Sequence, residues 1–316
     1  DMYMIDNKAL FAAIVFHFVI SSRGSISTPG PKTPKSTGDS FPQVIDKMMG
    51  WEPVESVSWK DYTVAVHRRD DRSRLTLWKN GSCLYTMHGP RFMLPLAFKE
   101  ENAFPAMGQD ITGDGIPNVA FIQFNGKWHF CWDLYILKLI PEAETIDVVT
   151  GLNVPSCFRN CDDEPDLEVV VHDPAFCYWR CCYAGSPQPE VILKYRDRGY
   201  KACPPLMRRR APPLEELKDR ADTVRATYQG SSDLLTGEMT RSDLWSVMID
   251  LIYSGHMALA WQFFESAWPH GDKGKREFLA DFTKQLENSA FWPAIKELNH
   301  DSMAPLSATE RATKEN

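Results

Sequence analysis

Alternation of apolar and polar residues predicts antiparallel β-strands in the first half of the chain. Residues 62–66 alternate, and residues 75–78 and 83–87 repeat the pattern. A polar turn at 70–71 separates the first two segments. Asn-Gly at 80–81 tolerates positive φ and marks a hairpin between the next two. These segments predict a β-meander.

Two further β-segments are predicted after residue 118. The apolar run 119–124 is followed by a turn at 125–126 and by a strand from 127 to 139. Residues 145–149 can add a short strand. Weaker echoes of the same pattern, a Pro followed by an acid, precede the apolar runs that begin near 167 and 191. Such recurrence is typical of repeated hairpins or blades.

Beyond Pro212 the apolar spacing becomes helical. Leu214, Leu217, Ala221 and Val224 recur at intervals of three and four residues. Further helices are predicted over about 242–254, 256–268, 275–289 and after 293, the first two forming a helical hairpin.

The pattern therefore predicts an α+β fold. An antiparallel β-rich domain, either propeller-like or a stack of sheets, covers 45–205, and a small helical domain covers 212–300. Outside them we predict a signal-peptide-like segment at 1–22, a flexible linker at 23–44 and a disordered tail at 301–316.

The N-terminal segment favours export. The apolar run 9–20 is too short for a bilayer, which needs roughly 20 residues, but it fits the apolar region of a secretory signal. A buried helix is the alternative. We expect a periplasmic or secreted protein whose mature chain has no membrane span.

The charge of the chain argues against a nucleic-acid partner. The formal net charge is −7, whereas nucleic-acid binders usually present a basic face. The one dense basic run, 208–210, is flanked by prolines and is interpreted as a solvated linker.

The segment 110–118 has the spacing of a calcium loop. Asp110, Thr112 and Asp114 offer side-chain oxygens, Ile116 offers its carbonyl, and Asn118 stands at the ninth position. Calcium takes six to eight oxygen ligands, and a Gly at the sixth position permits the sharp turn. The alternative is a β-turn in which Asp and Gly serve geometry alone.

Because a strand follows this loop, the segment resembles the calcium loops of FG-GAP (integrin-type) β-propeller blades. The resemblance covers 105–125 and, less closely, 158–172, where alignment on the Pro matches Asn160, Asp162 and Asp166 but puts Phe158 at the first acid. It implies loops that stabilise blades, faces that bind partners, and kinship with exported bacterial proteins of this architecture.

Six of the eight cysteines fall between 157 and 203. Disulfides are expected if the chain is exported, free packed thiols if it is not, and a zinc site is a third possibility. The sequence does not assign the partners.

The densest aromatic segment is 172–179. Asp173, Phe176, Tyr178 and Trp179 are predicted to line a sugar- or peptide-binding cleft, with 176–181 forming a strand whose side chains alternate between two faces. A buried aromatic core with a turn-forming Asp is the alternative.

We find no motif of a known catalytic constellation in the sequence. The sequence favours a non-enzymatic extracytoplasmic binding protein with a weak structural Ca²⁺ and a protein or carbohydrate partner. The alternative is a periplasmic hydrolase of carbohydrate or cell-wall material, in which Asp173 or Asp133 beside Trp179 or Trp132 supplies acid–base chemistry.

Overall fold

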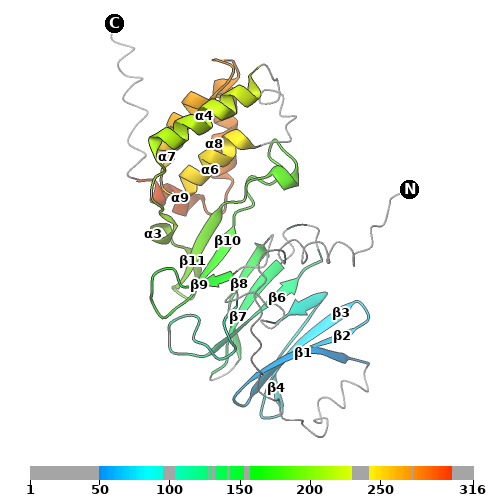
Figure 1. The fold of residues 1–316 in the computed structure, drawn as a ribbon. Helices are drawn as coiled ribbons and strands as arrows, with labels where there is room; N and C mark the ends of the chain where they lie inside the picture. Colours follow the sequence, from blue (N-terminus) through cyan, green and yellow to red (C-terminus); the bar gives the residue numbers. More distant parts are fainter. Residues whose placement is uncertain are drawn as a thin grey trace, which may run out of the picture. The chain divides into compact units, whose positions relative to one another are not determined.

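The computed structural model describes residues 50–94, 104–126, 129, 132–140, 143–152, 157–229, 242–271 and 273–300 (Figure 1). The predicted signal segment, linker and C-terminal tail lie outside these residues. Among the helices that are described, none is both long enough and apolar enough to cross a bilayer.

Three consecutive four-stranded antiparallel sheets form the β part, each in simple sequence order. The strands of the first sheet are β1 (Glu52–Trp59), β2 (Tyr62–Arg69), β3 (Arg72–Lys79) and β4 (Ser82–Gly89). Those of the second are β5 (Arg91–Met93), β6 (Asn118–Phe124), β7 (Trp132–Lys138) and β8 (Glu144–Leu152). Those of the third are β9 (Cys157–Arg159), β10 (Glu168–His172), β11 (Glu190–Arg196) and β12 (Gly199–Ala202).

The predicted antiparallel β-rich fold is confirmed at this level. A complete propeller usually needs at least four blades, and the described residues form three sheets with no closed ring. The three apolar runs that follow Pro117, Pro165 and Pro189 do not occupy equivalent strands. Two of the apolar runs form the second strand of a sheet, β6 and β10, whereas the third forms β11, a third strand.

The second sheet is buried on both faces. Val119 and Phe121 of β6 belong to a core shared with the first sheet, whereas Ala120 and Ile122 belong to a core shared with the third sheet and the helices. Successive side chains of a strand point to opposite faces, so this strand reads as a continuous apolar run and not as an alternating one.

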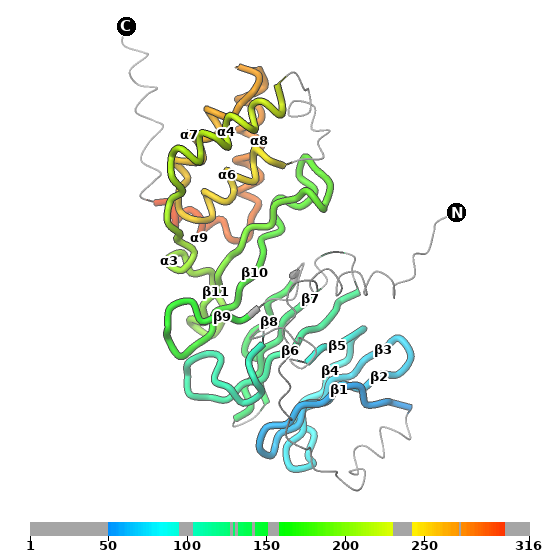
Figure 2. Tube along the Cα trace, viewed as in Figure 1, coloured from blue at the N-terminus to red at the C-terminus, as the bar shows by residue number. Residues whose placement is uncertain are grey.

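The C-terminal part is helical, as predicted, and Figure 2 traces its path. Its helices are α3 (Pro204–Met207), α4 (Leu214–Tyr228), α6 (Asp243–Tyr253), α7 (Met257–Ala267), α8 (Lys275–Glu287) and α9 (Trp292–Leu298). The α6 helix is apolar on nearly all sides and packs against α7 and α4. The β part and the helices share one core.

A buried carboxylate joins the third sheet to the helices. Asp173, directly after β10, is 1% exposed. Its Oδ1 accepts a hydrogen bond from the Ala175 amide at 2.9 Å, and its Oδ2 accepts one from the Tyr253 hydroxyl at 2.5 Å and another from Ser289. Burial, together with the nearby Asp173 charge, raises the pKa of Tyr253, which therefore stays a neutral donor.

The strand predicted over 176–181 is wrong. Residues 174–181 form turns, and a short 3₁₀ helix follows at Tyr183–Gly185. Tyr178 and Arg180 have φ of 61° and 52°, which an extended strand excludes. Tertiary contacts hold the backbone of this segment in turns, although its side chains alternate in the sequence as they would in a strand.

Residues 208–210 form an exposed connection without regular secondary structure, as the linker interpretation expects, and two of its arginines also contact the helices. Arg208 donates to the Leu298 carbonyl at 2.5 Å, at the end of α9. Arg209 forms a 2.7 Å ion pair with Asp250 of α6. The basic run is therefore fastened to the helical part.

Candidate cation site in two equivalent acidic loops

Two acidic loops occupy the same place in successive sheets. Residues 110–117 lead into β6 and residues 160–167 lead into β10, each the second strand of its sheet. In the first sheet the matching connection is the short turn at 60–61. The two loops also touch, because the Leu167 amide donates to the Ile111 carbonyl at 2.9 Å.

Hydrogen bonds fix the correspondence between the loops. The Ile111 amide donates to Asn118 Oδ1 at 2.7 Å, and the Cys161 amide donates to Glu168 Oε2 at 2.8 Å, with the same separation along the chain. At the loop start, the Gly113 amide donates to Asp110 Oδ1 and the Asp163 amide donates to Asn160 Oδ1. Gly113 and Asp163 both have positive φ, of 72° and 62°.

The alignment of the loops on their prolines is therefore wrong by two residues. Asn160, not Phe158, stands at the first position, and Phe158 lies in β9 with its side chain in the core. The third, fifth, seventh and ninth positions are all acids: Asp162, Glu164, Asp166 and Glu168. The strict alternation of acids from 162 to 168 is the sequence signal that could have identified this register.

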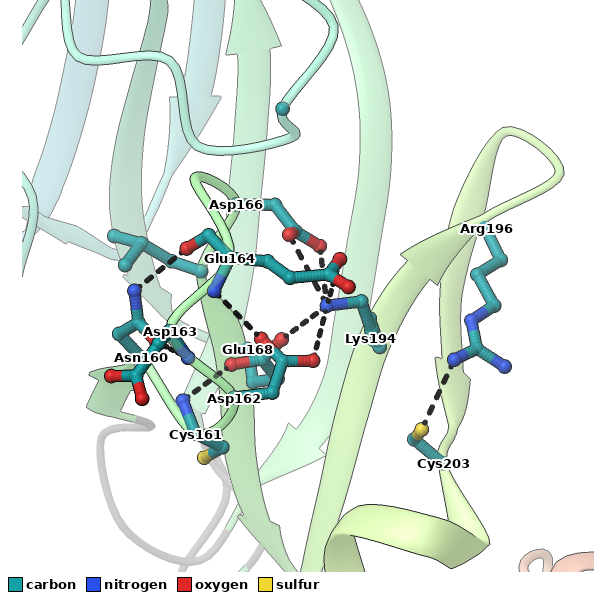
Figure 3. Close-up of polar contacts among 12 residues, drawn as sticks. Asn160, Cys161, Asp162, Asp163, Glu164, Asp166, Glu168, Lys194, Arg196 and Cys203 are labelled. Carbon is teal, nitrogen blue, oxygen red and sulfur yellow. Dashed lines mark hydrogen bonds and ion pairs between the residues drawn. The ribbon is translucent and has the colours of Figure 1, made fainter.

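The four carboxylates converge on one ammonium group (Figure 3). Lys194 Nζ lies 2.7 Å from Asp162 Oδ2, 3.2 Å from Glu164 Oε2, 3.1 Å from Asp166 Oδ2 and 3.0 Å from Glu168 Oε1. The side chain of Lys194 is 8% exposed and that of Glu168 is fully buried. These contacts place the ammonium at the centre of the four carboxylates.

The electrostatics favour the charged forms of Lys194 and Asp162. Burial alone would lower the pKa of Lys194, but hydrogen bonds to the four carboxylates outweigh burial and raise it. The hydrogen bond from Lys194 is the main cause that lowers the pKa of Asp162. Since four carboxylates face one ammonium, the loop retains a negative charge, and losing the lysine would leave acids to repel one another.

The first loop has a lysine in the equivalent place. Lys138 of β7 pairs with Asn118 in the sheet and forms a 3.0 Å ion pair with Asp114. In the third sheet, the register Val169 with Leu193 puts Lys194 opposite Glu168 in the same manner. The hydrogen bond to Asp114 raises the pKa of Lys138. Burial acts to raise the pKa of Asp114, but hydrogen bonds, that from Lys138 foremost, lower it.

The oxygens predicted to bind calcium in the first loop are used within the protein. Asp110 accepts hydrogen bonds from the amides of Gly113 and Gly115 at 2.8 and 2.7 Å. Asp114 Oδ1 accepts from Thr112 Oγ1 at 3.0 Å and from the Ile116 amide at 3.1 Å. This is the pattern of an Asx-type turn.

In both loops the carboxylates already have partners within the protein. In the second loop, Asp162, Glu164 and Asp166 have carboxylate oxygens within 4.8 Å of one another and could hold a metal ion, but all three bind Lys194. An ion would first have to displace the ammonium.

Of the four predicted ligand-binding residues, the structure brings one clearly to the surface. Phe176 is fully buried and packs on Phe282, and Trp179 packs edge-on against Trp245 with ring centroids 5.3 Å apart. Asp173 is the buried link already described. Tyr178 is 56% exposed.

Among the described residues, five cysteines have free thiols: Cys83, Cys161, Cys181, Cys182 and Cys203. The metal-capable group found among the described residues contains carboxylates and no thiol. Of these cysteines, Cys181 and Cys203 are buried in the protein, whereas Cys83 and Cys182 are exposed.

We predict that Lys194→Met lowers the free energy of unfolding by about 3–5 kcal/mol, because it leaves buried carboxylates without their counter-charge. Lys138→Met, which removes a single partly exposed ion pair, should cost up to about 1 kcal/mol. Urea unfolding measures both. Equal losses in the two variants would contradict the central role given to Lys194.

Acid should weaken the second loop. The folded-state pKa of Asp162 is lowered, so its contribution to stability is present above the unfolded value of about 4 and is lost as the pH falls below it. The stability deficit of Asp162→Asn relative to the wild type should therefore be larger at pH 7 than at pH 3. Unfolding curves at both pH values test this, and a constant difference would refute it.

Comparisons with protein-family models, curated proteins and solved structures find no match for this chain. Its function is therefore argued from its own geometry.

Proposed function

We propose that the chain is a non-enzymatic interaction protein built on blade-like sheets, in which a lysine ammonium takes the structural place of calcium. The observation that carries this proposal is the convergence of four loop carboxylates on Lys194. Acidic side chains that would otherwise be candidates for metal or acid–base chemistry are committed to holding the fold.

The sheet arrangement supports the comparison with FG-GAP blades. Each sheet has the four antiparallel strands of a propeller blade, and two of them carry an acidic loop at the same connection. In that family the loops stabilise blades and the faces bind partners. We extend the second property to this chain as part of the proposal.

The surface offers an exposed aromatic contact. Tyr178 lies beside His129 and Tyr183, with ring centroids 5.7 and 5.5 Å away. The loop that carries it is anchored by Arg180, whose guanidinium binds Asp281 at 2.9 Å. A fixed, exposed aromatic ring suits a protein or carbohydrate partner.

Export remains part of the proposal and depends on the apolar run 9–20. The free thiols do not support export, because cysteines in oxidising compartments usually form disulfides. An interaction role does not depend on which compartment holds the protein.

The hydrolase alternative has less support. The Asp173 carboxylate is buried and accepts three hydrogen bonds, so it is not available to a substrate. Asp133 lies on β7 near the Asn125 amide, at 3.4 Å. Glu216 and Asp250 line a small cavity, but each is ion-paired with an arginine.

Turnover and binding distinguish the two functions. We expect no release of reducing ends from cell-wall glycan or soluble polysaccharides, and retention on at least one insoluble polysaccharide or immobilised protein that Tyr178→Ala weakens. Val54→Ala, which trims another exposed apolar side chain, is the control and should bind as the wild type does. Release that Asp133→Asn abolishes would overturn the proposal in favour of hydrolysis.

A further inference from the structure

A small cavity lies on the helical part, away from both acidic loops. It has a volume of about 160 Å³ and is lined by the segment that begins at Arg209, the first turns of α4 and the last turns of α6. None of its lining residues belongs to the sites described above.

The cavity has an apolar floor. Leu217 of α4 and Val247 and Leu251 of α6 line it, and these side chains are 6%, 5% and 1% exposed. A small apolar group that enters the cavity would bury part of its surface against these three side chains, although the rest of the lining is mostly polar.

The rim is basic although the chain as a whole is acidic. Arg209 is ion-paired with Asp250 at 2.7 Å, and Arg220 lies 3.9 Å from Glu216, the limit of an ion pair. Arg210 is exposed and has no ion-pair partner among the described residues. Three guanidinium groups against two carboxylates leave a net positive rim.

The backbone that carries these arginines is fixed before any ligand arrives. The Arg209 amide donates to the Ser254 carbonyl at 3.3 Å, and His256 Nε2 lies 2.8 Å from the Arg209 carbonyl. Arg208 is held by the Leu298 carbonyl. Such preorganisation reduces the entropy that binding would otherwise cost.

The start of α4 adds to the positive potential. Its N-cap is Pro213, which provides no side-chain cap, and its first turn lines the cavity through Glu216 and Leu217. The first amides of a helix lack intrahelical acceptors and carry the positive end of the helix dipole. Glu215 and Glu216 in the same turn offset part of this potential, so the positive charge of the rim comes mainly from the arginines.

The size of the cavity selects the kind of ligand. Small-molecule sites usually measure about 300–1,000 Å³, so this cavity suits one side chain of a larger partner. We propose that it docks an acidic protein segment, which inserts one apolar side chain above Leu217 and Leu251 while neighbouring carboxylates bind Arg210 and Arg220. This docking site is separate from the exposed Tyr178 surface and goes beyond the proposed interaction function.

The test is fluorescence anisotropy with a labelled ten-residue peptide in which one leucine is flanked by glutamates. We expect saturable binding to the full chain, weakened at least tenfold by Arg210→Glu. Arg198→Glu is the matched control, since Arg198 is exposed on the β11–β12 turn and has no ion-pair partner among the described residues; it should bind as the wild type does.

Two further peptides separate anchoring from charge. Replacing the leucine by serine should weaken binding at least tenfold, and replacing the glutamates by lysines should abolish it. The proposal is overturned if no peptide binds at millimolar concentration, if Arg210→Glu and Arg198→Glu weaken binding equally, or if the serine peptide binds as well as the leucine peptide. Polysaccharide turnover is measured independently of peptide binding. Failure of the peptide test would contradict the docking site but not the non-enzymatic role. Turnover would contradict the non-enzymatic role but not the docking site.

Discussion

The ammonium of Lys194 is the contact on which the third sheet depends. It joins β11 to the loop between β9 and β10 through four carboxylates at 2.7 to 3.2 Å. Removing charges from water is costly, and a buried ion pair repays that cost only when its geometry is good and its remaining hydrogen bonds are satisfied. Here each carboxylate binds the ammonium, and Glu168 also binds the Cys161 amide.

The loops also connect neighbouring sheets. A Cβ on Gly113 would lie 3.0 Å from the Asp166 side chain, and φ of 72° at Gly113 is itself a conformation that favours glycine. This close approach and the hydrogen bond from the Leu167 amide to the Ile111 carbonyl hold the loop before β6 against the loop before β10. The third sheet in turn holds the helices through Asp173, Tyr253 and Ser289.

Much of the fold follows from the sequence because its signals are local. The strand around residues 62–66 and the α4 helix have the periodicity of their final structure, and the apolar run 119–124 forms β6, which is buried on both faces. The sequence also shows the acids of the second loop, but it does not show how that loop aligns with the first. Alignment on Pro165 gives a correspondence that the hydrogen bonds of Asn160 and Glu168 exclude. The sequence does not predict that Lys194 contacts the loop. The pairing of β10 with β11 places it there, and the register of that pairing cannot be read from a local sequence pattern. The same limit explains Trp179, whose neighbours come from α6 and α8.

The most direct measurement is thermal unfolding of the wild type and of Lys194→Met, each with excess calcium and with chelator. If the Lys194 ammonium takes the structural place of a calcium ion, the melting temperature of the wild type should not depend on calcium. The melting temperature of the variant should rise with calcium by mass action. A calcium-dependent rise in the wild type that Asp110→Ala with Asp114→Ala removes, or a variant indifferent to calcium, would contradict the account.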